Sequence, residues 1–215
     1  MLDNPLDPVA VRVLGSLIEK ERTTPDNYPL TLNALVAACN QTTNREPVLH
    51  LDEAAVVKAL DDLRRRSLVH EVFRSDSRAR RYRHVLSEKL SLHDAETALL
   101  CVLMLRGPQT TGEIRTRTAR MFEFRDLAHV EVTLQALMTL TTPLVVQLPR
   151  QPGHKEVRYG HLLAGQPEMP VVEPKVASGG ADDERVTALE HTVDTLRNEL
   201  ADLRSAFDEF RRQFQ

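Results

Sequence analysis

Apolar residues recur every three or four positions in three segments of the first 66 residues, which is the spacing of amphipathic helices. The predicted helices span about residues 8–20, 32–40 and 53–66. Asp7, Thr31 and Asp52 precede them, and each side chain can accept a hydrogen bond from a first-turn N–H. Residues 68–74 and 79–86 are typical of strands, with a polar turn between them. This part of the chain therefore predicts three helices followed by a β-hairpin.

The same order of elements appears a second time after residue 90. Helical spacing and strand composition predict three more helices and a second hairpin, at about residues 94–107, 110–121, 126–140, 144–150 and 155–163. Thr110 and Glu113 have the spacing of a capping box. Tyr82 and Tyr159 fall at matching places in the two hairpins. Repetition on this scale predicts two copies of one module.

Three helices followed by a hairpin form the pattern of a winged helix-turn-helix. We therefore predict an α+β, mostly helical fold with two tandem winged helix-turn-helix domains and a C-terminal coiled-coil helix. The segment 165–182 is rich in proline and glycine and is predicted to be a linker. The predicted order along the chain is a first winged-helix domain, a second one, the linker and the coiled-coil helix, at residues 1–90, 91–164, 165–182 and 183–215.

Beyond the linker, apolar residues are spaced alternately three and four apart, which is the period of a coiled coil. The seam consists of Val186, Leu189, Val193, Leu196, Leu200, Leu203, Phe207, Phe210 and Phe214. Valine at the first two a positions and leucine at d favour a parallel homodimer through this helix. The alternatives are that the helix pairs antiparallel, binds another protein, or folds back on its own domains.

Charge and cysteine content narrow the class of protein. Residues 1–90 and 91–164 each have a net charge of +1, and residues 165–215 have a net charge of −5. The two cysteines, Cys39 and Cys101, lie in apolar helical patterns and are predicted to be buried thiols. The N-terminal segment does not resemble a signal peptide, and no apolar run is long enough to span a bilayer. We expect a cytoplasmic protein with no membrane partner.

Three blocks of sequence resemble a known family. They are EKERTTPDNYPLTLNALVAACNQTTNREPV, LMLRGPQTTGEIRTRTARM and YGHLLAG. These blocks resemble the YceH-like family of bacterial proteins, and the similarity covers about residues 7–165. The resemblance implies a tandem winged-helix fold, but no particular activity, ligand or site residues.

Two groups of arginines are candidates for contact with double-stranded DNA. The outward positions of the third helix in each module offer few side chains suited to reading bases, and those of the first include several carboxylates. The basic charge lies instead on the first hairpin and on the second helix of the second module, at Arg74, Arg78, Arg80, Arg81, Arg83, Arg115, Arg117 and Arg120. The alternatives are salt bridges to the protein's own carboxylates and a function as a protein-binding scaffold that does not contact DNA.

The turn between the second and third helices is long and unusually rich in amides and hydroxyls. In one interpretation, Asn40 and Asn44 maintain the turn geometry and Arg45 anchors it to a neighbouring element. In the other, Gln41, Thr43, Asn44 and Arg45 form a polar recognition or phosphate site. The local sequence does not separate the two interpretations.

We predict no enzymatic activity, cofactor or bound metal. The chain has no glycine-rich phosphate loop, and its histidines are not spaced as metal ligands.

Overall fold

The computed structural model describes residues 4–74, 77–150 and 156–167. All of them lie in one compact unit, Met1–Met169. The fold is mixed α+β and about half helical, with small antiparallel sheets. The predicted coiled-coil seam, residues 186–214, lies outside the described residues.

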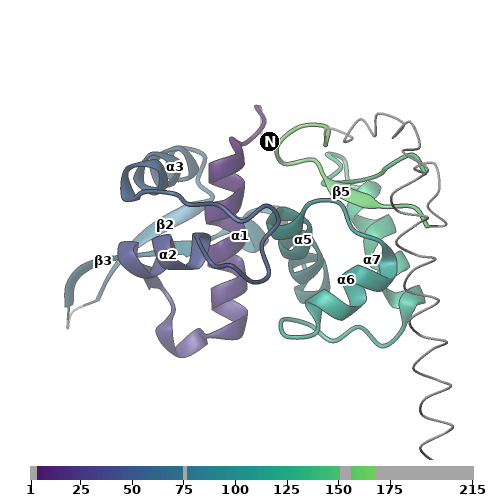
Figure 1. Ribbon diagram of the computed structural model, residues 1–215, viewed down its shortest axis with the longest axis horizontal. Coiled ribbons are helices and arrows are strands. Elements are labelled where there is room, and N and C mark those ends of the chain that lie inside the picture. The colour runs from purple at the N-terminus through teal and green to yellow at the C-terminus, as the bar shows by residue number, and fades with distance from the viewer. Residues whose placement is uncertain (1–3, 75–76, 151–155, 168–215) are drawn as a thin grey trace, which may run out of the picture. The chain divides into compact units, whose positions relative to one another are not determined.

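The first half of the unit follows the predicted order of elements (Figure 1). They are α1 (Pro8–Thr23), the 3-10 helix η1 (Pro25–Asn27), β1 (Leu30–Thr31), α2 (Leu32–Cys39), α3 (Glu53–Arg65), β2 (Val69–Arg74) and β3 (Ser77–His84). The strands form an antiparallel sheet in the order β1-β3-β2. The sequence did not predict β1, because a strand of two residues has no readable period and exists only through its pairing with β3.

The second half repeats this order with shorter strands. After a short helix, α4 (Leu86–Leu90), come α5 (Asp94–Arg106), α6 (Thr111–Thr118), α7 (Leu127–Met138), β4 (Val145–Gln147) and β5 (Tyr159–His161). β4 and β5 are antiparallel, and Gln109 forms a bridge with Tyr159. In the first half, Leu30 is paired with Tyr82 in the same way. Both bridges lie one residue before a helix-capping threonine.

The predicted helix starts are confirmed. The Asp7 side chain accepts from the Val9 N–H, and Asp52 accepts from the Ala55 N–H, each at 2.8 Å. Thr31 caps α2, and Thr110 forms the predicted capping box with Glu113. Each cap satisfies a backbone donor that the helix itself leaves unpaired.

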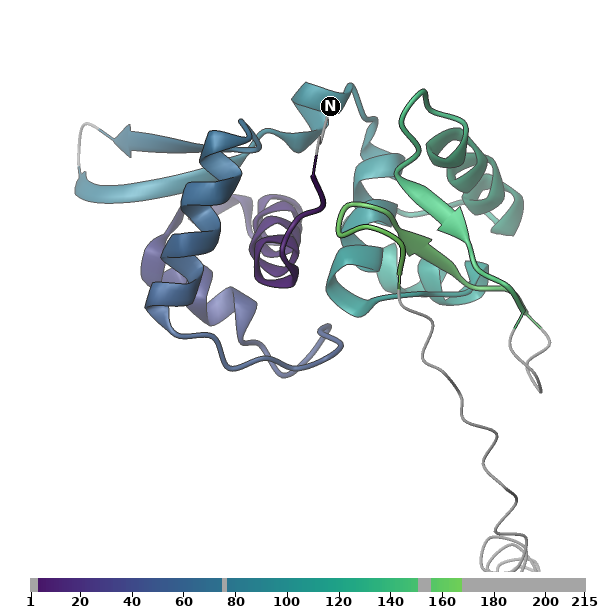
Figure 2. The same cartoon turned by 90° about the horizontal axis from the view of Figure 1, so that it is seen from above.

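The two halves share a continuous hydrophobic core centred on α1 and α5, which lie side by side (Figures 1 and 2). Gly15 lets the helices approach closely, because a Cβ at this position would lie 2.9 Å from a methyl carbon of Leu105. Cys39 and Cys101 are buried free thiols, as predicted. The Cys101 thiol donates to the Gly15 carbonyl at 3.3 Å, and burial raises its pKa.

Candidate nucleic-acid interface

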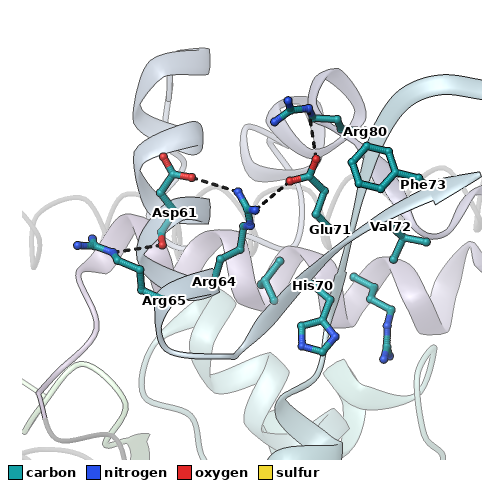
Figure 3. Close-up of a pocket in the computed structure, with 10 residues that line it drawn as sticks. Asp61, Arg64, Arg65, His70, Glu71, Val72, Phe73 and Arg80 are labelled. Carbon is teal, nitrogen blue, oxygen red and sulfur yellow. Dashed lines mark hydrogen bonds and ion pairs between the residues drawn. The ribbon is translucent and has the colours of Figure 1, made fainter.

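A broad hollow of about 1170 Å³ opens between the C-terminal end of α3 and the β2–β3 hairpin (Figure 3). Backbone hydrogen bonds fix these elements to each other: the Leu68 N–H donates to the Leu63 carbonyl, and the Val85 N–H donates to the Leu68 carbonyl, both at 2.9 Å. The hollow is lined by Asp61, Arg64, Arg65, Val69, His70, Glu71, Val72, Phe73, Arg80 and Arg83.

Glu71 organises the guanidinium groups at this hollow. Its side chain is only 8% exposed. It contacts Arg64 Nη2 at 3.1 Å and Arg80 Nε at 3.2 Å, as Figure 3 shows. Arg64 also lies 3.5 Å from Asp61. A guanidinium carries five N–H donors, so these ion pairs orient the two arginines and leave donors available to a ligand.

The lining is basic and partly apolar. The lining contains four arginines and the carboxylates of Asp61 and Glu71. Its net charge is therefore +2 before any contribution from His70. The side chains of Arg65 and Arg80 are 77% and 67% exposed. Phe73 is 70% exposed, so an apolar ring lies among exposed cations.

The structure places the predicted hairpin arginines in different environments. Arg80 and Arg83 line the hollow. Arg83 also donates to the Glu88 carboxylate at 2.6 Å. Arg81 instead donates to the Pro29 carbonyl at 2.8 Å, which ties the hairpin to the segment before β1. The side chains of Arg74 and Arg78 lie outside the described residues.

The acidic character expected of the exposed face of α3 is largely compensated. Asp52 is the N-cap. Asp62 contacts Arg65 at 3.3 Å and Arg66 at 2.8 Å. Arg64, which the sequence pattern did not single out, is the arginine that connects α3 to Glu71. The run of three arginines at the end of the helix was the available signal for it, since cations are favoured in the last turn.

The second arginine cluster does not form a single exposed patch. Arg115 donates to the Arg125 carbonyl at 3.1 Å. Arg117 contacts Glu113 at 3.4 Å. Arg120 is exposed, and it makes no ion pair with any of the residues that the structure describes.

A buried side chain of the turn between α2 and α3 fixes the turn to α1. The Arg45 side chain is fully buried and contacts Glu19 through two hydrogen bonds, of 2.6 and 3.1 Å. Gln41 accepts a weaker bond of 3.4 Å from Arg45, while Thr43 is exposed. Asn44 has a positive φ of 59°, a conformation that asparagine tolerates, and its side-chain oxygen accepts from Arg106.

A second amide closes the same turn. The Asn40 side chain donates to the Leu51 carbonyl at 2.8 Å and accepts from the Leu51 N–H at 2.7 Å. Asn40 therefore contacts the far end of the turn. These contacts favour the structural interpretation for Asn40, Gln41 and Arg45, and they leave Asn44 beside the second arginine cluster.

His84 is buried and His161 is partly buried. His84 Nε2 lies 2.8 Å from a carboxylate oxygen of Glu21. Burial alone would raise the pKa of Glu21, but the hydrogen bond and charge of His84 hold it below its usual value. Burial lowers the pKa of His161 to about 4, so this ring is neutral at neutral pH. In the described part of the chain, no group of three potential metal ligands converges.

These features define an α+β protein made of two similar helix-and-hairpin halves that share a core, with a basic hollow beside the first hairpin. No helix in the described ranges has both the length and the apolar character needed to cross a membrane.

The chain belongs to the family described as "Protein of unknown function, DUF480", whose model matches residues 6–154. A UPF0502 protein of Geobacter sulfurreducens is 52% identical, with 98% of each chain covered. A UPF0502 protein of Azoarcus sp. is 49% identical and covers 97% of this chain and 94% of its own, and one of Solibacter usitatus is 47% identical over both full lengths. The YceH-like resemblance read from the sequence is consistent with this membership.

Proposed function

We propose that this chain is a non-enzymatic, DNA-associated protein built from two tandem winged helix-turn-helix units. The repeated order of three helices and a hairpin supports this interpretation. So does the matching bridge before the second helix of each unit, which pairs Leu30 with Tyr82 and Gln109 with Tyr159. In both units the third helix begins at an aspartate cap, Asp52 or Asp126.

The observation that carries the DNA proposal is the set of arginines around the hollow beside α3. Arg64 and Arg65 come from the helix, and Arg80 and Arg83 come from the hairpin. Arginine can bind a phosphate through two parallel N–H donors, and phosphate contacts supply most of the affinity of non-specific DNA binding. In this proposal the hollow accepts the sugar–phosphate backbone, while α3 contributes little base readout.

The proposed role is non-enzymatic because of the chemistry in the lining. Among the described residues that line the hollow there is no serine, threonine or cysteine that His70 could activate. The arrangement offers guanidinium donors, the apolar ring of Phe73 and the carboxylate of Glu71. This combination suits binding of a polyanion.

DNA affinity should fall steeply with salt and vary little with sequence. Four arginine–phosphate contacts would give a slope of log affinity against log salt of roughly −3.6, at about −0.9 for each phosphate. The double variant Arg65→Gln, Arg80→Gln should flatten the slope by about 1.8 and weaken binding to unrelated duplexes alike. Fluorescence anisotropy at salt concentrations between roughly 50 and 200 mM measures both.

The double variant should still fold, because Glu71 keeps its ion pair with Arg64 and Asp62 keeps its ion pair with Arg66. The variant Arg115→Gln, Arg125→Gln removes the same charge from exposed positions outside the hollow. An equal loss of slope in both variants would argue against a role for the hollow. Strong preference for one duplex sequence would contradict weak base readout.

A second candidate function, protein binding, is favoured by the exposed face of α7. Leu127 and Val132 are 44% and 69% exposed on this helix. Glu131 and Gln135 are exposed beside them. α7 occupies the place in the second half that α3 occupies in the first, yet its surface is more apolar. A scaffold role would use this face, with or without DNA on the first unit.

Self-association through the C-terminal helix is the third element of the proposal. The seam would bury nine apolar side chains in each chain if two helices paired, so the full chain should sediment as a dimer. A shortened chain that ends at Met169 keeps the compact unit and should sediment as a monomer. Analytical ultracentrifugation of the two distinguishes the models. If the full chain and the shortened chain are both monomers, the seam would instead bind another partner.

A further inference from the structure

A small, partly open cavity of about 30 Å³ lies where the α2–α3 turn meets the second half of the unit. It is formed by the C-terminal half of α1, the turn, the end of α5 and the region of α6. Its polar lining consists of Glu19, Thr23, Asn44, Arg106, Arg117 and Arg120. The turn and the second arginine cluster, which are far apart in sequence, therefore contribute to the same site.

The Glu19 carboxylate of the lining is already paired with Arg45. Both carboxylate oxygens of Glu19 accept from the buried guanidinium of Arg45, at 3.1 and 2.6 Å. The Lys20 ammonium lies a further 3.8 Å from this carboxylate. Glu19 is thus paired directly with Arg45, and it acts on Arg106 only through its charge, without a direct ion pair.

These three arginines are incompletely compensated. Arg106 donates to a neutral oxygen, the side-chain carbonyl of Asn44. Arg117 shares the Glu113 carboxylate with Arg158, and its Nη1 is buried without a hydrogen-bond partner among the described residues. Burial, together with the nearby charge of Arg117, lowers the pKa of Arg106. Arg120 makes no ion pair with the described residues.

We propose that this cavity binds a phosphate group, held by Arg106, Arg117 and Arg120. A tetrahedral oxyanion can accept hydrogen bonds from several directions, which matches guanidinium groups that arrive from α5, α6 and the segment after α6. A volume of 30 Å³ holds roughly two to three water-sized positions, at about 10–15 Å³ each. The cavity therefore admits two or three of the four oxygens of one phosphate and excludes a sugar or a base.

The bound phosphate would connect the two halves of the unit. Asn44 belongs to the turn of the first half, and Arg117 and Arg120 belong to the second. A ligand that binds only the folded chain stabilises it, and the stabilisation grows with the logarithm of ligand concentration above Kd. The source is either free inorganic phosphate or the terminal phosphate of a nucleotide, and the site is separate from the hollow proposed to bind DNA.

Calorimetric titration of the full chain with inorganic phosphate tests the proposal. A chloride salt keeps the ionic strength constant. We expect saturable binding with one site per chain. The variant Arg120→Gln should weaken the affinity for phosphate at least tenfold. Arg115→Gln, which removes the same charge from a neighbouring position outside the cavity, should change it less than twofold.

The unfolding midpoint provides a second measurement. Millimolar phosphate should raise it in the unmodified chain and in Arg115→Gln, but not in Arg120→Gln, whose midpoint without phosphate should be normal. Tighter binding of adenosine monophosphate than of phosphate would identify a nucleotide as the source, and equal binding would identify the free ion. The proposal is overturned if the unmodified chain shows no saturable phosphate binding, or if both variants lose it equally.

Discussion

Replacing Arg45 with methionine should lower the free energy of unfolding by about 3–5 kcal/mol, the range for removing one partner of a buried ion pair. The Arg45 side chain is 0% exposed and that of Glu19 is 10% exposed. The substitution leaves the Glu19 carboxylate in a poorly solvated site without its two closest donors. It also removes the hydrogen bonds that Arg45 donates to the carbonyls of Ala38 and Asn44. Denaturant unfolding monitored by circular dichroism measures the loss.

Two control variants separate the ion pair from other features of the turn. Gln41→Ala removes a side chain whose bond to Arg45 is long, at 3.4 Å, so it should cost less than about 1 kcal/mol. The double variant Glu19→Met, Arg45→Met replaces both charges with apolar groups and should recover most of the stability lost in Arg45→Met. A loss below about 1 kcal/mol in Arg45→Met would show that Glu19 is solvated well enough to stand alone.

The turn illustrates which contacts a sequence conceals. Its composition predicted a polar network and left two interpretations open, because amides and hydroxyls serve both turns and ligands. The deciding partner, Glu19, lies 26 residues earlier and is buried on α1, directly after the apolar Leu17 and Ile18 in the sequence. Helical periodicity gives no reason to place a carboxylate there. Only the packing of α1 against the turn brings Glu19 and Arg45 together.

The candidate interface was predictable in part. The arginine-rich hairpin was evident, and Arg80 and Arg83 do line the hollow. Arg81 could not be assigned, because the carbonyl it binds belongs to Pro29, beside the unpredicted strand β1. Arg64 was overlooked, since its importance depends on Glu71, which is contributed by another element. Periodicity identified the main helices and the two hairpins of this fold, and long-range pairing determined the environment of each charge.

The phosphate cavity arises in the same way. Asn44 and Arg117 were each predictable from sequence, in separate hypotheses about the turn and the second arginine cluster. Their convergence depends on the packing of α1 against α5, which brings the turn to α6. The Glu46 N–H donates to the Leu105 carbonyl at 2.9 Å, so the backbone of the turn is attached directly to α5. The α1–α5 contact therefore positions the candidate site.

Replacing Gly15 with leucine should disrupt that contact and lower the free energy of unfolding by about 3 kcal/mol, at the upper end of the usual cost of overpacking. Gly15 faces α5, where a Cβ would lie 2.9 Å from Leu105 Cδ2 and 3.3 Å from Met104 Cβ. Leucine would force the helices apart or displace buried side chains. Because the halves share one core, we expect a single unfolding transition at lower denaturant concentration.

Gly112→Leu is the matched control for this substitution. Gly112 also lies in a helix, α6, but the nearest neighbour of an added Cβ would be the Thr110 hydroxyl oxygen, at 3.9 Å. There the change should be neutral or stabilising by up to about 1 kcal/mol, because leucine has the higher helix propensity. Equal destabilisation at both glycines would contradict the packing argument. Two separate transitions in Gly15→Leu would show that each half folds without the other, and phosphate binding at the cavity between them should then be lost.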